Sequence, residues 1–150
     1  MVDITGKADV FREAEVAGRI RLKTSTIRLI RDRLVEKGDP VAVAQVAGVL
    51  AAKNTSQLIP LCHPISLTDV DVDVRLFNVS VEVRARVKAR ERTGVEMEAL
   101  LAVTVALLTI WDMVKKYEKD ERGQYPTTVI RDIRVLKKEK GKARNEPNSG

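Results

Sequence analysis

The longest apolar segment of the chain is residues 99–111, thirteen consecutive uncharged and mostly apolar residues. Glu96 and Glu98 precede this segment, and Asp112 and Lys115 follow it. The run is too long for an ordinary strand and is rich in Ala and Leu, so it predicts a helix buried in the core. It is too short to cross a membrane, which needs about 20 apolar residues. The chain is therefore predicted to be organised around one core helix with charged side chains at both ends.

The two charged ends of this helix are far apart for one small molecule. Glu98 and Asp112 are separated by fourteen positions, which corresponds to about 21 Å along a helix axis. Either only one end is functional, or a second copy of the chain places the opposite end of its own helix beside the first. We interpret the spacing as an indication of an active site shared between subunits.

The remaining apolar positions follow the periods of strands and helices in turn. Alternation of Val or Leu with charged residues predicts half-buried antiparallel strands, whereas apolar residues at a spacing of three or four predict helices. Thr24, Ser25 and Thr26 offer caps for the first helix, and Asp39 followed by Pro40 begins the second. The predicted strands are residues 12–23, 67–76, 79–87 and 129–138, and the predicted helices are residues 27–36, residues 40–53 and the central helix. Four strands interspersed with three helices indicate an α+β fold, in which helices cover an antiparallel sheet.

Two segments lack a regular period. In residues 54–66, Pro60 and Pro64 bracket the sequence Leu-Cys-His, and two prolines four residues apart predict an irregular, rigid loop. Residues 137–150 are basic and have no apolar anchor, so we expect a mobile tail there. Residues 1–136 are then expected to form a single domain.

Composition and charge favour a globular protein with a negatively charged ligand. The 150 residues and the hydrophobic content of 44% suit one domain with a substantial core. The net charge of +6 suits a polyanionic partner, either nucleic acid or a phosphorylated small molecule. The aromatic content of 3% weakens the nucleic-acid interpretation, because proteins that bind single strands usually supply stacking rings.

The chain has one cysteine and one histidine, which limits the disulfides, metal sites and catalytic groups that it can form. Cys62 alone cannot form an internal disulfide and fits a reducing cytoplasm, and the first residues lack the apolar centre of a signal peptide. One cysteine beside one histidine, His63, argues against a conventional zinc site. His63 could donate protons or anchor a substrate, or it could be a structural histidine. Cys62 is more typical of a packed side chain than of a nucleophile, because no second histidine can activate it.

The charged groups near the helix ends each have a functional and a structural interpretation. Glu96 and Glu98 could bind the donor edge of a purine, or they could simply stabilise the helix dipole. Asp112 and Lys115 could form an acid/base pair or an ordinary ion pair within the helix. Lys37 lies near a helix start, where backbone amides favour phosphate, although a surface lysine at a turn is the commoner case.

Five motifs together resemble one enzyme family. They are MVDIT, KGDP, AGVLAAKNTSQLIPLCHP, TGVEMEAL and VALLTIWDMVKK. They resemble the cyclic pyranopterin monophosphate synthase family of molybdenum cofactor biosynthesis, MoaC, over about residues 1–142. The resemblance implies a ferredoxin-like fold and a homohexamer, a trimer of dimers, with active sites at subunit interfaces. It also implies that a cyclised dihydro-GTP, made by a radical SAM partner enzyme, is converted to cyclic pyranopterin monophosphate with release of pyrophosphate.

The same resemblance implies roles for individual residues. Asp112 would be the catalytic acid/base with Lys115 as its partner, and Lys37 would act on the substrate. Leu61, Cys62 and His63 would belong to the substrate-binding loop. The base end of the substrate would be contacted by Glu96, Met97 and Glu98. Phosphate contacts would come from Arg12, Lys53 and Lys138, although the closing family motif KxGGKSG is broken here by Lys140 and Ala143. No cofactor held by the protein is implied, and Mg²⁺ could accompany the triphosphate.

The rival interpretation is a basic ferredoxin-like module that binds RNA without catalysis. It explains the positive charge and the lysine-rich tail. However, the alternating segments carry valines and carboxylates where an RNA-binding sheet would show stacking aromatics. The enzyme interpretation predicts a cytoplasmic protein with a small-molecule substrate and with no nucleic-acid or membrane partner.

Overall fold

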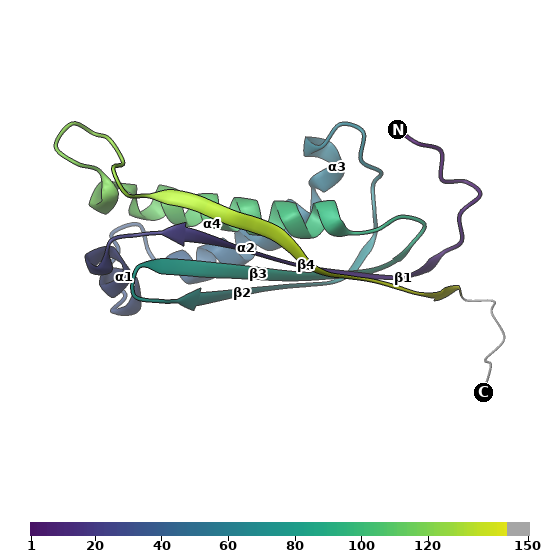
Figure 1. Ribbon diagram of the computed structural model, residues 1–150, viewed down its shortest axis with the longest axis horizontal. Coiled ribbons are helices and arrows are strands. Elements are labelled where there is room, and N and C mark those ends of the chain that lie inside the picture. The colour runs from purple at the N-terminus through teal and green to yellow at the C-terminus, as the bar shows by residue number, and fades with distance from the viewer. Residues whose placement is uncertain (144–150) are drawn as a thin grey trace.

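The computed structural model describes residues 1–143, which form a four-stranded antiparallel sheet and four helices (Figure 1). The strands follow the order β2-β3-β1-β4 across the sheet. They are β1 (Val10–Arg21), β2 (Leu67–Leu76), β3 (Ser80–Glu91) and β4 (Val129–Ala143). The helices are α1 (Thr24–Arg31), α2 (Pro40–Lys53), α3 (Thr55–Leu58) and α4 (Glu96–Glu118). This is the predicted ferredoxin-like α+β fold, with a short helix, α3, added inside the segment expected to be irregular.

The core lies between one face of the sheet and the helices α2 and α4. The inward side chains of β3 are fully buried, as their alternation predicted; they are Val81, Val83, Ala85 and Val87. A stripe of fully buried alanines on α4 faces the same core, namely Ala99, Ala102 and Ala106. A Cβ atom at Gly48 of α2 would lie 3.1 Å from the Ala102 carbonyl oxygen. Glycine at this position therefore lets the two helices approach closely.

Helix α4 spans 23 residues, and by length and composition alone it could cross a membrane. The helix is longer than the uninterrupted apolar run that marked it in the sequence, because charged residues extend it at both ends. Half of the most apolar stretch of this helix is buried inside the protein, where the helix packs against β1, β3 and α2. Its apolar composition is therefore accounted for by its place in the core.

Helix α1 ends earlier than predicted. The apolar spacing predicted a helix to residue 36, but α1 stops at Arg31. Arg33 adopts a left-handed backbone conformation with φ of 58°, and the Leu34 N–H donates to the Leu29 carbonyl oxygen at 2.9 Å. This hydrogen-bond pattern is a common way to terminate a helix. The chain beyond it forms the turn that leads into α2.

Strand β4 continues beyond its predicted end. Residues 139–143, which the sequence placed only in the tail, pair with β1 up to the register of Val10 with Ala143. Backbone pairing along a strand edge requires no apolar side chains, so the hydrophobic pattern carried no signal for this extension. A Cβ atom at Gly141 would lie 2.8 Å from the Phe11 Cβ, so glycine makes room for the base of that side chain. The mobility expected for residues 144–150 concerns residues outside the described part of the chain.

Candidate active site

The predicted site residues separate into two groups at opposite ends of α4. Figure 1 shows α1 and the loop of residues 119–128 at one end of the molecule, and α3 and the N-terminal segment at the other. The three predicted catalytic residues belong to the first end, and most of the predicted substrate-binding residues belong to the second. A single chain therefore does not bring all the predicted residues into one site.

Asp112 is held between two lysines at the first end. Lys37 Nζ lies 3.1 Å from Asp112 Oδ2 and 3.1 Å from the Asp112 carbonyl oxygen, while Lys115 Nζ lies 3.0 Å from Oδ1. Lys115 first, and Lys37 second, hold the pKa of Asp112 below its ordinary value through hydrogen bonds and charge. Asp112 in turn raises the pKa of Lys115. All three side chains are about half exposed, so this cluster adds little to stability but stays accessible to a ligand.

A sharp turn brings Lys37 to α4. Gly38 has φ of 121°, a conformation that glycine adopts most readily. Asp39 caps α2 by accepting a hydrogen bond from the Val41 N–H at 3.0 Å, and Pro40 is the first helical residue. The KGDP motif therefore encodes a turn followed by a helix start. Its lysine contacts Asp112, whereas the sequence had suggested a phosphate site at the helix start.

An apolar cavity of about 410 Å³ adjoins the Asp112 cluster. Its walls are formed by Leu108, Trp111, Asp112, Lys115 and Ile130. The Trp111 ring meets the Tyr125 ring edge to face, with centroids 5.1 Å apart. The sequence reasoning missed these apolar residues, although Trp111 is the only tryptophan and directly precedes Asp112. The cavity could cover one face of a planar ring beside the charged cluster.

A second cavity, of about 470 Å³, lies at the N-terminal end of α4. The loop after α3 contributes Leu61, Cys62 and His63 to its walls, and the first turn of α4 contributes Glu96 and Met97. These five residues come from two segments that are separated in sequence, and the structure brings them together. Carboxylate, imidazole and apolar groups around one cavity suit a ligand with a polar planar ring.

The N-terminal segment forms a further wall of this second cavity, through Val2, Ile4 and Lys7. The Thr5 N–H donates to Asp3 Oδ1 at 2.9 Å, and the Lys7 N–H donates to the Ile4 carbonyl oxygen at 3.0 Å, so the segment is locally folded. The sequence reasoning used the MVDIT motif only for the family resemblance. That motif was the available signal for this wall.

Glu98 is a buried carboxyl group that contacts Cys62 beside the same cavity. It is 2% exposed, Cys62 Sγ lies 3.9 Å from its Oε1, and its Oε2 has no hydrogen-bond partner within residues 1–143. Burial raises the pKa of Glu98, and the charge of Glu96 raises it further. Burial, followed by the influence of Glu98, raises the pKa of the Cys62 thiol. A protonated thiol is a poor nucleophile, which favours the interpretation of Cys62 as a packed side chain.

Glu96 connects the second cavity to β4. Its carboxylate pairs with Lys138 Nζ at 2.8 Å. The same carboxylate lies against Gly94, where a Cβ atom would overlap it. Glycine at position 94 therefore permits the observed orientation of Glu96, and the structure places Lys138 beside a residue that was predicted to contact the base.

Arg12 is bound to backbone groups. It is 8% exposed, and its guanidinium donates to the carbonyl oxygens of Glu91 and Arg92 at 3.4 Å each. A buried guanidinium requires such acceptors. Arg12 therefore holds the connection between β3 and α4, next to the first turn of that helix.

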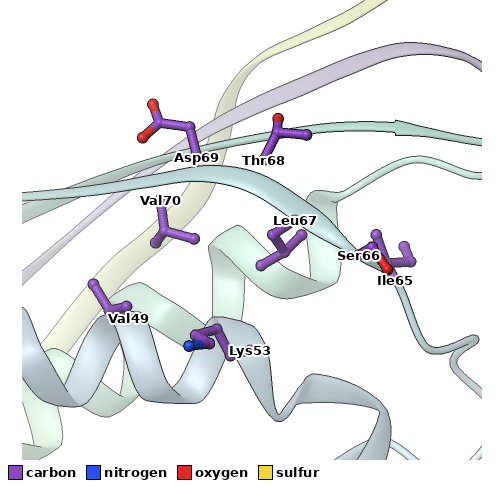
Figure 2. Close-up of a pocket in the computed structure, with 8 residues that line it drawn as sticks. All are labelled: Val49, Lys53, Ile65, Ser66, Leu67, Thr68, Asp69 and Val70. Carbon is purple, nitrogen blue, oxygen red and sulfur yellow. The ribbon is translucent and has the colours of Figure 1, made fainter.

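Lys53 lines a third cavity, of about 450 Å³, between α2 and the edge strand β2. Figure 2 shows the Lys53 side chain on α2 below the strand, while Thr68 and Asp69 project on the upper side of β2. The apolar side chains of Leu67 and Val70 project from the strand towards α2, and Val49 lies on α2 near Lys53. Lys53 therefore lies in different surroundings from the Asp112 cluster within one chain.

The α+β fold carries two groups of polar side chains beside cavities of small-molecule size, an arrangement that suits an enzyme. Comparison with known proteins then identifies the family. Residues 1–141 match the model of the MoaC family. The chain belongs to the MoaC family, and its role lies in molybdenum cofactor biosynthesis.

Curated relatives cover most of the chain. A protein of Pyrococcus abyssi named probable cyclic pyranopterin monophosphate synthase is 58% identical over 92% of this chain and 87% of its own length. A protein of the same name from Sulfurisphaera tokodaii is 58% identical over 92% of this chain and 91% of its own length. Another, from Thermococcus kodakarensis, is 56% identical over 94% of this chain and 90% of its own length. The family resemblance predicted from the five motifs is confirmed.

Proposed function

We propose that this chain is a cyclic pyranopterin monophosphate synthase. It converts a cyclised dihydro-GTP, the product of a radical SAM partner enzyme, to cyclic pyranopterin monophosphate and releases pyrophosphate. The observation that carries the proposal is the Asp112 carboxylate between the amino groups of Lys37 and Lys115. The names of the relatives from Pyrococcus abyssi and Sulfurisphaera tokodaii support the same activity.

The Asp112 cluster suits both parts of this reaction. Rebuilding a purine ring into a pterin requires several proton transfers, and an ionised Asp112 can accept a proton and later return it. Closing the cyclic phosphate forms a bond from a substrate hydroxyl oxygen to the α-phosphorus, while the bond to the pyrophosphate oxygen breaks. Asp112 can take the hydroxyl proton, and Lys37 and Lys115 can stabilise the charge that grows on pyrophosphate.

The base-binding half of the site comes from a second chain in this proposal. Glu98 and Asp112 lie about 21 Å apart along α4, so one chain does not surround a compact cyclised nucleotide on both sides. A second copy can place its Glu96 and His63 cavity opposite the Asp112 cluster of the first. Each active site then lies at a subunit interface.

Exposed apolar side chains support an assembly of several copies. Val43, Val46 and Leu50 follow one another along α2 and are 44–61% exposed. Leu61 and Leu108, one near each cluster, are 71% and 57% exposed. Covering apolar surface gains about 25 cal/mol per Å². The proposed assembly is a homohexamer, a trimer of dimers.

The other predicted residues have binding roles in this proposal. The substrate-binding loop contributes Leu61, Cys62 and His63, and the base end is contacted by Glu96, Met97 and Glu98. The residues for phosphate are Arg12, Lys53 and Lys138. Any Mg²⁺ in the reaction enters with the triphosphate, whose oxygens are its usual ligands. Among residues 1–143, no three Asp, Glu, His or Cys side chains form a group that could hold a metal ion. The reaction takes place in the cytoplasm on a small-molecule substrate.

Turnover by the purified protein tests the proposed function. The protein is supplied with cyclised dihydro-GTP, pyrophosphate is measured, and the pterin is detected by fluorescence after oxidation. The proposal predicts both products in equal amounts. Binding of the triphosphate without either product would contradict it and would leave a non-catalytic scaffold as the better interpretation.

The rival RNA-binding function is separated from the enzyme by its salt dependence. On the sheet face opposite the helices, Glu82 pairs with Arg19 at 2.9 Å and with Arg84 at 2.8 Å. Glu82 therefore neutralises part of the positive charge of this face. Binding carried by phosphate contacts with RNA would weaken steeply as salt rises. RNA affinity with that dependence, together with no turnover, would favour the rival.

A further inference from the structure

The turn that carries Lys37 is attached to the last turn of α4. The Glu36 backbone N–H donates to the Tyr117 hydroxyl oxygen at 2.9 Å. The Glu36 carboxylate also pairs with Lys116 Nζ. In the same region, Lys23 Nζ donates to the Tyr117 carbonyl oxygen at 3.2 Å. Two neighbouring side chains of α4 therefore hold the residue immediately before Lys37.

Of these two side chains, Tyr117 constrains the turn more strongly. The side chains of Lys116 and Glu36 are 63% and 69% exposed, and such an ion pair is screened by salt and costs side-chain entropy. Tyr117 is half-buried and its ring packs against the core. Its hydroxyl accepts a hydrogen bond from the main chain, so it restrains the backbone of the turn directly.

Tyr117 and Asp112 both lie on α4, so the helix fixes their relative positions. They are five residues apart in α4, which is about 7.5 Å along the helix axis. Lys37 has a long side chain that is 49% exposed, so its approach to Asp112 depends on where the turn holds its backbone. The Gly38 N–H to Val35 carbonyl bond, at 3.1 Å, shapes the turn internally but does not attach it to α4.

We infer that Tyr117 is a positioning residue, whose hydroxyl holds the Glu36 N–H so that Lys37 Nζ stays within hydrogen-bond distance of Asp112. The catalytic meaning of this inference rests on the proposed function, whereas its geometry does not. A lysine that is already in place needs no ordering when the substrate reacts. Tyr117 itself contacts no reacting atom in this scheme and acts through Lys37.

Tyr117→Phe tests the inference because it removes only the hydroxyl. We expect kcat for the cyclised dihydro-GTP to fall about three- to tenfold and KM to change less than about twofold. Lys37 and Lys115 are the charged groups that contact Asp112. If Lys37 moves away, the Asp112 carboxyl group, followed by carbon-13 NMR, should titrate at a higher pH than in the wild type. The shift should be smaller than in Lys37→Ala.

Thr104→Val is the matched control. It removes a hydroxyl that donates to the Leu100 carbonyl oxygen at 2.7 Å within the same helix, eight residues before Asp112. Its kcat and its Asp112 titration should match those of the wild type. In addition, the Glu36 amide of the wild type should exchange with solvent more slowly than the same amide in Tyr117→Phe. Equal exchange in the two proteins would overturn the inference.

The outcomes separate this inference from the proposed function. If Tyr117→Phe has the wild-type kcat and the wild-type Asp112 titration, Tyr117 is no positioning residue, while the synthase activity stands. If its kcat falls but the titration of Asp112 is unchanged, the loss arises elsewhere and the inference is again wrong. If the wild type has no turnover but the titration shifts in Tyr117→Phe, the proposed function fails and the positioning of Lys37 stands.

Discussion

Lys37 and Asp112 are 75 residues apart in the chain, and Lys37 Nζ lies 3.1 Å from Asp112 Oδ2. Lys115 Nζ donates a hydrogen bond to the other carboxylate oxygen, Oδ1, at 3.0 Å. The two lysines favour the ionised form of Asp112 and lower its pKa. The carboxylate is therefore a proton acceptor with two cations beside it. This relationship links the turn before α2 to the last turns of α4.

Asp112→Asn should abolish turnover and leave binding largely intact. The amide keeps the shape of the carboxylate but cannot accept the proton, so kcat should fall by at least about a hundredfold. The affinity for cyclised dihydro-GTP, measured by calorimetry, should weaken less than about threefold. Asp71→Asn, an exposed carboxylate on β2, is the control and should retain full turnover. Equal losses of binding and turnover in Asp112→Asn would count against a catalytic role.

The pH dependence of kcat/KM should show the effect of Lys115 and Lys37 on the pKa of Asp112. Because Lys115 and Lys37 lower the pKa of Asp112, the ionised form persists to lower pH than for an ordinary aspartate. Removing either lysine should raise this pKa, so the activity that remains should be lost at a higher pH as the solution is acidified. The displacement should be larger in Lys115→Ala than in Lys37→Ala, because Lys115 contributes most. If kcat/KM falls on acidification at the same pH in the wild type, in Lys115→Ala and in Lys37→Ala, Asp112 is not the titrating group.

Glu98 should make stability fall as pH rises. The unfolded chain releases this proton at the ordinary glutamate pKa, whereas burial raises the pKa in the folded protein. Stability is therefore greatest below the unfolded pKa, falls as pH rises towards the folded pKa, and is level above it. Glu98→Gln should remove this slope in urea unfolding at one chain concentration. Glu121→Gln, an exposed acid, should keep it, and an unchanged slope in Glu98→Gln would refute the assignment.

Two positions with positive φ should respond in opposite directions to substitution. Arg33 has φ of 58°, and Arg33→Gly should stabilise the fold by about 1 kcal/mol because glycine adopts this conformation without strain. Gly38 has φ of 121°, and Gly38→Ala should destabilise it although the nearest atom to an added Cβ is 3.9 Å away. Thermal unfolding of both variants measures the difference. Destabilisation by Arg33→Gly would show that its side chain has a role beyond the turn.

Local patterns in the sequence were sufficient for most of the fold. Helix α2 has its predicted bounds, Pro40–Lys53, because a cap and a proline mark its start locally. The alternating valines likewise predicted β2 and β3. The end of α1 could not be predicted, because it depends on Arg33 adopting a conformation that arginine rarely occupies. The extension of β4 to Ala143 depends on pairing with β1, which its own composition does not reveal.

The candidate site depended more on tertiary structure. Motifs predicted the residues of the site, but they did not show whether Lys37 and Asp112 meet within one chain. The structure brings these two residues together within one chain. Hydrophobic periodicity did not reveal the wall formed by Val2 and Ile4, because that segment is short and has no period, and the MVDIT motif was its available signal. Arg12 was predicted as a phosphate contact, and its guanidinium is instead bonded to backbone carbonyl groups, so that role remains a prediction.

The central claim is that each active site combines the Asp112 cluster of one chain with the second cavity, which Glu96 lines, of another chain. Asp112→Asn and Glu96→Gln chains, each with low activity alone, are mixed so that hybrid oligomers form. In a hybrid dimer, one of the two sites then contains neither substitution. About a quarter of the wild-type activity should return in an equal random mixture.

A mixture of Lys37→Ala and Asp112→Asn chains is the matched control, because both substitutions lie in the same cluster of one chain. Every site in that mixture contains a substitution, so no activity should return. Restored activity in the first mixture and none in the second is the predicted result. No restored activity in the first mixture, with hybrid oligomers isolated by two different affinity tags, would contradict the shared site.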